Sequence, residues 1–321
     1  MKEINITDIK GIEIGQAQNF EAGTGCTAVI AKDGACAGVD VRGGGPASRE
    51  TDCLRAENMI DRIHCVMLSG GSAYGLEAAC GAMDYLEEQG VGFDVGVAKV
   101  PIVCGCSLFD LTVGSSSVRP DKAMGYEACK NATNEPPLQG NYGAGTGASV
   151  GKYFGMNNCM KSGIGHYAVQ AGEVQCGAIV AVNALGDVID VETNKIMAGL
   201  LNDAQTEFID TNKVMFEEIS GDRDVWKGNT SLGCVITNAK LTKAQCNKLA
   251  SIAHNGYAKA IRPVHTSADG DTIYVLSTGE VNVSPDALGA LATEVMAKAI
   301  NNALRHAKAA YGLKCAADFK K

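Results

Sequence analysis

The stretch that decides the fold reads Gly228-Asn229-Thr230-Ser231 and continues into the apolar residues 232–236, Leu-Gly-Cys-Val-Ile. A small polar turn that carries hydroxyl groups is followed by a short apolar run, which is the pattern of a buried β-strand. We therefore predict a strand that begins just after Thr230, with the hydroxyl of this residue at the mouth of the strand.

A second stretch, about forty residues further along the chain, repeats this arrangement. Residues 266–271 read Thr-Ser-Ala-Asp-Gly-Asp, a polar turn that brings Asp269 and Asp271 to the start of a strand over residues 272–276. If the two strand openings lie side by side, a hydroxyl and two carboxylates come within reach of each other. That combination suits a hydroxyl nucleophile whose base is held by acids. A pair of ordinary turns is the other interpretation of the pattern.

Composition limits the class of protein. The chain has 321 residues, of which 46% are hydrophobic and 20% charged, enough for one large or two medium domains. A net charge of −8 argues against nucleic acid or an anionic membrane as the main partner, since both attract cations. Thirteen scattered cysteines and a start without an apolar signal segment predict reduced thiols and a cytoplasmic location. The sequence also contains no apolar run of about 18 residues that would span a membrane.

Periodicity and turn signals predict the remaining elements. We expect a hairpin of residues 27–30 and 38–41, a helix over 48–63, a strand over 66–68 and a helix over 72–88. A second hairpin is expected from residues 177–182 and 188–191. A capping box, Thr242-Lys243-Ala244-Gln245, starts a helix that must end before Pro263, and Ser284-Pro285 starts a long amphipathic helix. Hairpins, grouped strands and long helices suit a single α+β domain in which helices cover stacked sheets.

A glycine run at residues 143–152, Gly-Ala-Gly-Thr-Gly-Ala-Ser-Val-Gly-Lys, partly resembles a phosphate loop. The P-loop pattern requires Gly where Thr146 stands and a hydroxyl residue where Tyr153 stands, so the NTPase interpretation is weak. The run remains suited to a close approach of the backbone to another strand or to a substrate. Lys152 is either a solvated lysine or the cation of a site. Asn183, at a strand end, either completes a turn or has a catalytic role.

Other reactive residues have ordinary interpretations. Ser72 lacks the flanking glycine of a G-x-S-x-G elbow and reads as a helix N-cap. The pair Cys104 and Cys106 has no second ligand pair at metal-site spacing, so core packing is favoured. His254 and His265 are expected to have a structural or rim role rather than to act as a ligand or base.

Several motifs in the same order resemble one family. The segments GNTSLGCVITNAKLTKAQ and AHNGYAKAIRPVHTSADGDTIYVLSTG, together with ITDIKGIEIG, SGGSAYGLEAA, GAGTGASVGK, KSGIG and GAIVAVN, cover nearly the whole chain. They resemble the P1 peptidase family, which contains the L-aminopeptidase/D-esterase enzymes, the β-peptidyl aminopeptidases and the nylon-oligomer hydrolases. The fold implied by this resemblance is an αββα sandwich related to that of the ornithine acetyltransferases.

The resemblance further implies that the chain cleaves itself between Asn229 and Thr230. The products would be an α chain of residues 1–229 and a β chain of residues 230–321, held in one folded unit. The nylon-oligomer hydrolase branch is most similar at the site. Its threonine nucleophile, its Asp-x-Asp pair, its upstream asparagine and its lysine match, in that order, Thr230, Asp269 with Asp271, Asn183 and Lys152. A tyrosine of that branch is replaced here by Phe109, which removes one hydrogen bond expected toward an oligoamide.

The mechanism implied by the family needs no metal or organic cofactor. The freed α-amine of Thr230, with an ordinary pKa of roughly 7.7–8.0, would act as the base for its own hydroxyl. Asp269 and Asp271 would orient that amine, Asn183 would stabilise the oxyanion, and Lys152 would support the same charge or fix Asn183. Phe109, Gly145 and Thr146 are expected to contact the substrate, which would be a peptide or an oligoamide.

Four interpretations stay open at this point. The enzyme can be an aminopeptidase or amidase, or a hydrolase of 6-aminohexanoate (nylon) oligomers. An acyltransferase of the ornithine acetyltransferase type would require an amine acceptor. A non-catalytic binding homologue would remain a single intact chain. By resemblance, the processed protomers are expected to form a homo-oligomer.

Overall fold

The computed structural model describes residues 1–221 and 228–319 of the chain. Its helices are α1 (Ala78–Glu88), α2 (Lys122–Lys130), α3 (Thr211–Glu217), α4 (Lys243–Ala260) and α5 (Pro285–His306). The long or central strands are β2 (Glu13–Asn19), β3 (Thr24–Val41), β5 (Arg62–Ser69), β8 (Val103–Ser107), β11 (Ile164–Ala171), β12 (Val174–Ala181), β15 (Leu232–Ala239) and β17 (Thr272–Val281). The short strands are β1 (Lys2–Ile4), β4 (Ser48–Arg49), β6 (Phe93–Asp94), β7 (Lys99–Val100), β9 (Ser149–Val150), β10 (Met160–Lys161), β13 (Asp187–Ile189), β14 (Ile196–Ala198) and β16 (Ile261–Arg262). Short 3-10 turns follow at Ile6–Asp8, Asp52–Leu54, Ser72–Glu77, Gly143–Gly145, Met156–Asn158 and Ala316–Phe319.

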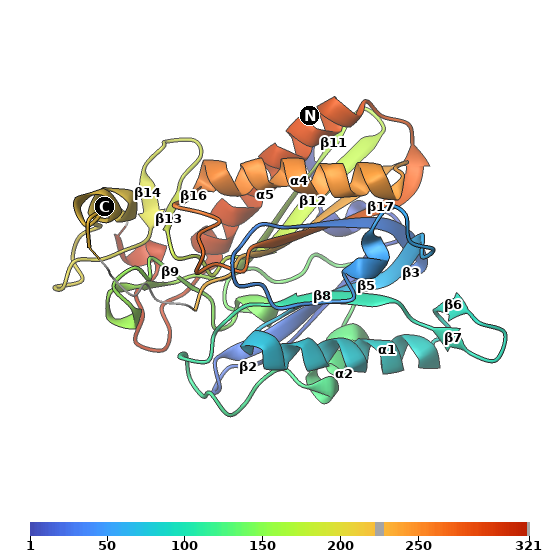
Figure 1. Ribbon diagram of the computed structural model, residues 1–321, viewed down its shortest axis with the longest axis horizontal. Helices are drawn as coiled ribbons and strands as arrows, with labels where there is room; N and C mark the ends of the chain where they lie inside the picture. Colours follow the sequence, from blue (N-terminus) through green and yellow to red (C-terminus); the bar gives the residue numbers. More distant parts are fainter. Residues whose placement is uncertain (222–227, 320–321) are drawn as a thin grey trace.

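The strands form two stacked layers that share β3. Hydrogen bonds run in the order β1-β11-β12-β15-β17-β3-β5-β8-β4, and β2 pairs with the first part of β3. Residues 24–30 of β3 pair with β2, whereas residues 36–41 pair with β17. Figure 1 shows α4 and α5 covering one face of this arrangement and α1 and α2 covering the opposite face. The expected αββα sandwich is therefore confirmed.

Side-chain alternation along the strands produces three hydrophobic layers. In β15, Leu232, Cys234 and Ile236 pack in the central layer between the sheets, while Val235 joins the layer under α4 and α5. In β5 the same alternation sends Cys65 and Met67 toward α1 and α2. A strand with apolar residues on both faces reads as a continuous apolar run, because both of its faces are covered.

Both long C-terminal helices begin where the sequence predicts. The Thr242 side chain accepts the backbone N–H of Gln245 and the Gln245 side chain accepts the N–H of Thr242, which completes the capping box of α4. Pro285 occupies the first turn of α5, where its missing N–H costs nothing. These helices pack against one face of the half of the sandwich that contains β15 and β17.

Three predicted elements are wrong. Asp33-Gly34 does not form a hairpin: the register of β3 against β5 shifts between Ile30 and Ala35, and Gly34 has a φ of +73°, so the chain makes a bulge and continues. Residues 48–63 contain β4, a 3-10 turn and the start of β5 in place of a helix. Residues 187–189 pair with β14 and β16 in a separate small sheet and not with β12.

Candidate active site

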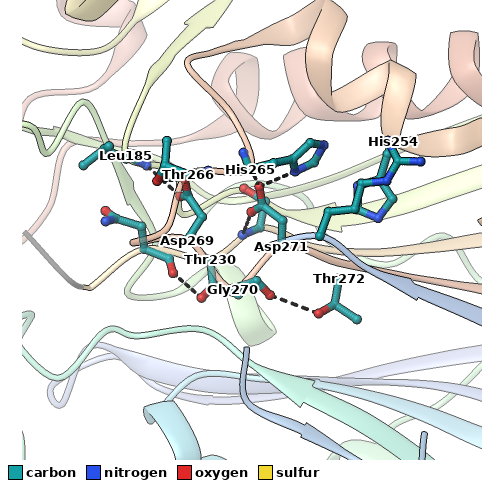
Figure 2. A network of polar contacts seen from close by, with 12 residues as sticks. Leu185, Thr230, His254, His265, Thr266, Asp269, Gly270, Asp271 and Thr272 are labelled. Carbon is teal, nitrogen blue, oxygen red and sulfur yellow. Dashed lines mark hydrogen bonds and ion pairs between the residues drawn. The ribbon is translucent and has the colours of Figure 1, made fainter. Parts of the chain in front are cut away.

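The two polar turns singled out in the sequence do lie side by side. Strands β15 and β17 are parallel neighbours, with Leu232 opposite Thr272, so both turns open at the same edge of the sheet. Two backbone bonds join the turns: the N–H of Gly270 donates to the Asn229 carbonyl (3.1 Å) and the N–H of Thr272 donates to the Ser231 carbonyl (3.1 Å). The adjacency of the two turns is therefore as predicted, and Figure 2 shows Asp269 and Asp271 in the same part of the structure as Thr230.

Thr230 is buried, with 4% of its surface exposed. Its hydroxyl contacts the carbonyl oxygen of Asn229, the group on the other side of the peptide bond that would be cleaved. Its backbone N–H donates to the Asn183 carbonyl (2.8 Å). The nucleophile candidate therefore faces its own upstream peptide and not open solvent.

The two carboxylates are held by different partners. Asp269 accepts hydrogen bonds from the N–H (3.0 Å) and the hydroxyl (2.5 Å) of Thr266 and from the N–H of Leu185 (3.3 Å). Burial, followed by the neighbouring charge of Asp271, raises the pKa of Asp269 to about 6. Asp271 accepts the N–H of Ser231 (2.8 Å), the residue directly after Thr230.

Lys152 is the buried cation of the site and not a solvated lysine. Its side chain is fully buried, and its Nζ donates to the carbonyl of Gly228 (2.9 Å) and to both the carbonyl (3.0 Å) and the Oδ1 (2.8 Å) of Asn183. Burial lowers the pKa of Lys152 to about 7, against the opposing pull of nearby acidic groups. The lysine thus fastens the residue two positions before Thr230 to the strand end at Asn183.

Asn183 is fully engaged in this arrangement. Its Oδ1 also accepts the N–H of Ser149 (3.0 Å), and its Nδ2 donates to the Phe109 carbonyl (2.9 Å) and, at 3.5 Å, to the Gly228 carbonyl. Phe109 contributes to the site through its backbone in this contact. The turn interpretation of Asn183 does not account for these contacts, which reach three separate segments of the chain.

The glycine run is a close-packing segment, as the sequence allowed. A Cβ on Gly145 would lie 2.1 Å from the backbone nitrogen of Ile164. The hydroxyl of Thr146 is buried and donates to the Gly143 carbonyl (2.7 Å), and the Gly145 carbonyl accepts from the Nζ of Lys161 (3.1 Å). These two residues therefore bond to protein groups, Thr146 within the loop and Gly145 to the buried Lys161.

Two groups in the site were missed by sequence reasoning. The N–H of Gly270 points at the Asn229 carbonyl, and no side-chain pattern reveals a backbone donor. The ring of His265, a residue expected to have a structural or rim role, contacts Asp271. The one feature of the sequence that could have indicated this contact is the position of His265 six residues before Asp271 in the same turn.

The described residues show neither a membrane-spanning helix nor a cluster of metal-binding side chains. Among residues 1–221 and 228–319, no helix is long and apolar enough to cross a membrane. Within the same ranges, no three His, Cys, Asp or Glu side chains are grouped so as to hold a metal ion.

The sequence profile of Peptidase family S58 matches residues 5–316. The chain belongs to this family, which confirms the resemblance inferred from the motifs and makes the protein a hydrolase of the peptidase and amidase class. An uncharacterized aminopeptidase of Mycobacterium tuberculosis is 35% identical over 340 residues, covering 96% of each chain.

Two further comparisons extend this assignment. A 6-aminohexanoate-oligomer endohydrolase of Paenarthrobacter ureafaciens is 31% identical over 311 residues, covering 91% of this chain and 84% of that protein. The structure of the L-aminopeptidase D-Ala-esterase/amidase of Ochrobactrum anthropi, described as a new variant of the Ntn hydrolase fold, superposes with a TM-score of 0.70 at 17% identity. That match covers 94% of this chain and 86% of the other. At that identity the likeness concerns the fold alone.

Proposed function

We propose that this protein is a self-processing amide hydrolase that cleaves its own Asn229–Thr230 bond and then uses Thr230 as an N-terminal nucleophile. The observation that carries the proposal is the contact between the Thr230 hydroxyl and the Asn229 carbonyl, enclosed by Asp269, Asp271 and Lys152. A buried hydroxyl directed at its own upstream peptide, beside a pair of acids and a cation, suits an intramolecular acyl shift.

In the self-cleavage step, the Thr230 oxygen bonds to the carbonyl carbon of Asn229, and negative charge develops on the Asn229 oxygen. The N–H of Gly270 already donates to that oxygen (3.1 Å), so it is the oxyanion donor that this geometry favours. When the C–N bond breaks, the nitrogen of Thr230 takes the proton lost by the hydroxyl, which leaves an ester between Asn229 and Thr230. Water then hydrolyses the ester, giving the Asn229 carboxylate and a free Thr230 with its amine and hydroxyl.

In the processed enzyme, the new amine serves as the base for the Thr230 hydroxyl. An α-amine titrates at roughly 7.7–8.0, so a useful fraction is neutral near neutral pH. The nitrogen that becomes this amine donates to the Asn183 carbonyl (2.8 Å) in the uncut chain, which supports a fixed place for it. The hydroxyl attacks a peptide or amide carbonyl, the amine of the product leaves with the proton, and water releases the acyl group.

Before cleavage, Lys152 and Asn183 hold the backbone on the upstream side of the nucleophile. Their shared contact with the Gly228 carbonyl is lost when the upstream segment departs, and the freed donors then face the reaction space. We propose that the Nδ2 of Asn183 and the Nζ of Lys152 then stabilise the oxyanion of the substrate.

Denaturing mass spectrometry of the purified protein tests the proposal. Wild type is expected to give two fragments that break between residues 229 and 230, whereas Thr230→Ala stays as one chain. Thr237→Ala is the matched control, because Thr237 is a buried threonine at the other end of the same strand and should leave cleavage unchanged. A single intact wild-type chain, or cleavage in Thr230→Ala, would refute the proposal.

A second candidate substrate class is the 6-aminohexanoate oligomers, favoured by the 31% identity to the endohydrolase of Paenarthrobacter ureafaciens. Blocking the free amine of the substrate separates the two classes, because only an aminopeptidase should refuse the blocked compound. By resemblance we expect the processed protomers to assemble as a homo-oligomer, which light scattering of the cleaved protein measures.

A further inference from the structure

His265 makes two hydrogen bonds to one oxygen of Asp271. Its backbone N–H (3.1 Å) and its ring Nδ1 (2.9 Å) both meet Oδ2 of the carboxylate, and Figure 2 shows the ring directed at Asp271. The other oxygen, Oδ1, accepts the N–H of Ser231 at 2.8 Å. Asp271 is therefore a bridge between His265 and the residue that follows the nucleophile.

The backbone and the packing around His265 keep this geometry in place. His265 has a φ of +57°, a left-handed conformation that is uncommon for residues other than Gly and that Asn, Asp and His adopt more readily than most. The centroid of its ring lies 4.7 Å from that of His254, in an edge-to-face arrangement, and 6.0 Å from that of Tyr257. In this backbone conformation, the backbone N–H and the ring Nδ1 of His265 both reach the same carboxylate oxygen of Asp271.

The hydrogen-bond pattern also identifies the tautomer. In the described part of the chain, the Nε2 of His265 is a buried atom without a hydrogen-bond partner. A proton at Nε2 would leave an unsatisfied buried donor, so the proton belongs on Nδ1, where Asp271 accepts it. The ring therefore donates through Nδ1 to the Asp271 carboxylate.

We propose that His265 is a positioning residue for the Thr230 site: it fixes the Asp271 carboxylate so that this group holds the backbone at Ser231 and presents its charge beside the nucleophile. The catalytic part of this inference rests on the proposed function. Without the ring donor, Asp271 would keep the Ser231 and His265 backbone contacts, one on each oxygen, but would lose the third bond that restrains its carboxylate. The nucleophile would then lose its fixed relation to the acid.

Three variants separate positioning from packing. His265→Leu removes the ring donor, and His265→Asn keeps a donor near the Nδ1 position in a residue that tolerates positive φ. His254→Leu is the matched control, since His254 is fully buried in the same cluster and its Nε2 contacts the Asp40 carbonyl (3.1 Å). We expect His265→Leu to slow self-cleavage and lower kcat by about 10- to 100-fold, with KM changed less than about twofold. His265→Asn should stay within about threefold of wild type, and His254→Leu should keep kcat while lowering the melting temperature.

Hydrogen exchange at the Ser231 amide gives a readout that does not depend on catalysis. In a Thr230→Ala background, which stays uncleaved, His265→Leu should speed this exchange by about tenfold or more, and His265→Asn should not. Unchanged exchange in His265→Leu, failure of His265→Asn to restore kcat, or an equal loss of kcat in His254→Leu would each overturn the proposal. If wild type is neither cleaved nor active, the proposed function fails, and exchange at Ser231 still decides whether His265 fixes Asp271.

Discussion

Replacing Lys152 by methionine tests whether the buried cation holds the bond that is to be cleaved. The fall of its pKa from 10.5 to about 7 corresponds to about 5 kcal/mol of unfavourable charge burial when the lysine is protonated. Its hydrogen bonds to Gly228 and Asn183 offset this cost, at about 1–3 kcal/mol for each buried acceptor that would otherwise be unpaired. Because the two contributions are similar, we expect Lys152→Met to change the free energy of unfolding by only a few kcal/mol.

The effect on self-cleavage should be larger and specific. The variant loses the charge-assisted hydrogen bond to the Gly228 carbonyl, which contributes about 1.5–3 kcal/mol to holding the upstream segment. If that contact is needed in the transition state, cleavage slows by about 10- to 100-fold. The assay follows the appearance of the two fragments on denaturing gels after rapid synthesis at pH 6, where the lysine is protonated, with urea unfolding measured in parallel.

Lys161→Met is the matched control for this experiment. Lys161 is equally buried and its pKa is also lowered to about 7 by burial, but it donates to the carbonyls of Gly145, Ala148 and Ser162. We expect this variant to cleave within about threefold of wild type. Equal slowing in both variants would mean that a buried charge as such matters, and not the contact with Gly228. An unchanged rate in Lys152→Met would remove this lysine from the cleavage site.

Three further predictions concern titration and packing. Burial lowers the pKa values of Lys152 and Lys161, so the unfolded chain binds more protons above pH 7; the free energy of unfolding of Thr230→Ala should therefore rise between pH 7 and pH 9, by up to about 1.4 kcal/mol per pH unit for each lysine. A flat or falling urea-unfolding profile would contradict this sign. Asp269→Asn should slow self-cleavage at least about tenfold. Because burial raises the pKa of Asp269 to about 6, this acid lowers the free energy of unfolding as the pH rises from 4 to 6, and the variant should lose that contribution. Gly165→Ala should lower the melting temperature and reduce the free energy of unfolding by about 1–3 kcal/mol or more, because the added Cβ would lie 2.2 Å from the Ala303 nitrogen in α5. An unchanged melting temperature would show that α5 can shift to make room for the methyl group.

The parts of the fold that local chemistry specifies were predictable from the sequence. The capping box at Thr242 defines a helix start through bonds made within three residues, and Pro285 defines another through its fixed φ and missing N–H, so both signals act locally. The apolar runs that follow Thr230 and Asp271 predicted strands because burial on both faces leaves a direct mark on the sequence. The family motifs then supplied the layered architecture.

Other features depend on partners that lie far along the chain. The Asp33-Gly34 pair has the composition of a hairpin turn, but pairing of β3 with both β5 and β17 makes an extended, bulged strand the better-bonded path. A helix over residues 48–63 fails for a related reason, since Ser48 and Arg49 find strand partners on β8. In both places, long-range hydrogen bonds outweigh a weak local preference.

The site divides in the same way. The sequence predicted that Thr230, Asp269 and Asp271 would meet if their two strands were neighbours, because all three lie at the openings of recognisable strands. The burial of Lys152, the direction of the Gly270 N–H toward the Asn229 carbonyl and the contact of His265 with Asp271 could be learned from the tertiary structure alone. Burial and hydrogen bonding depend on surroundings that are assembled from distant segments of the chain. The residues next to a lysine or a backbone N–H in the sequence therefore do not reveal whether that group is buried or which partner it bonds.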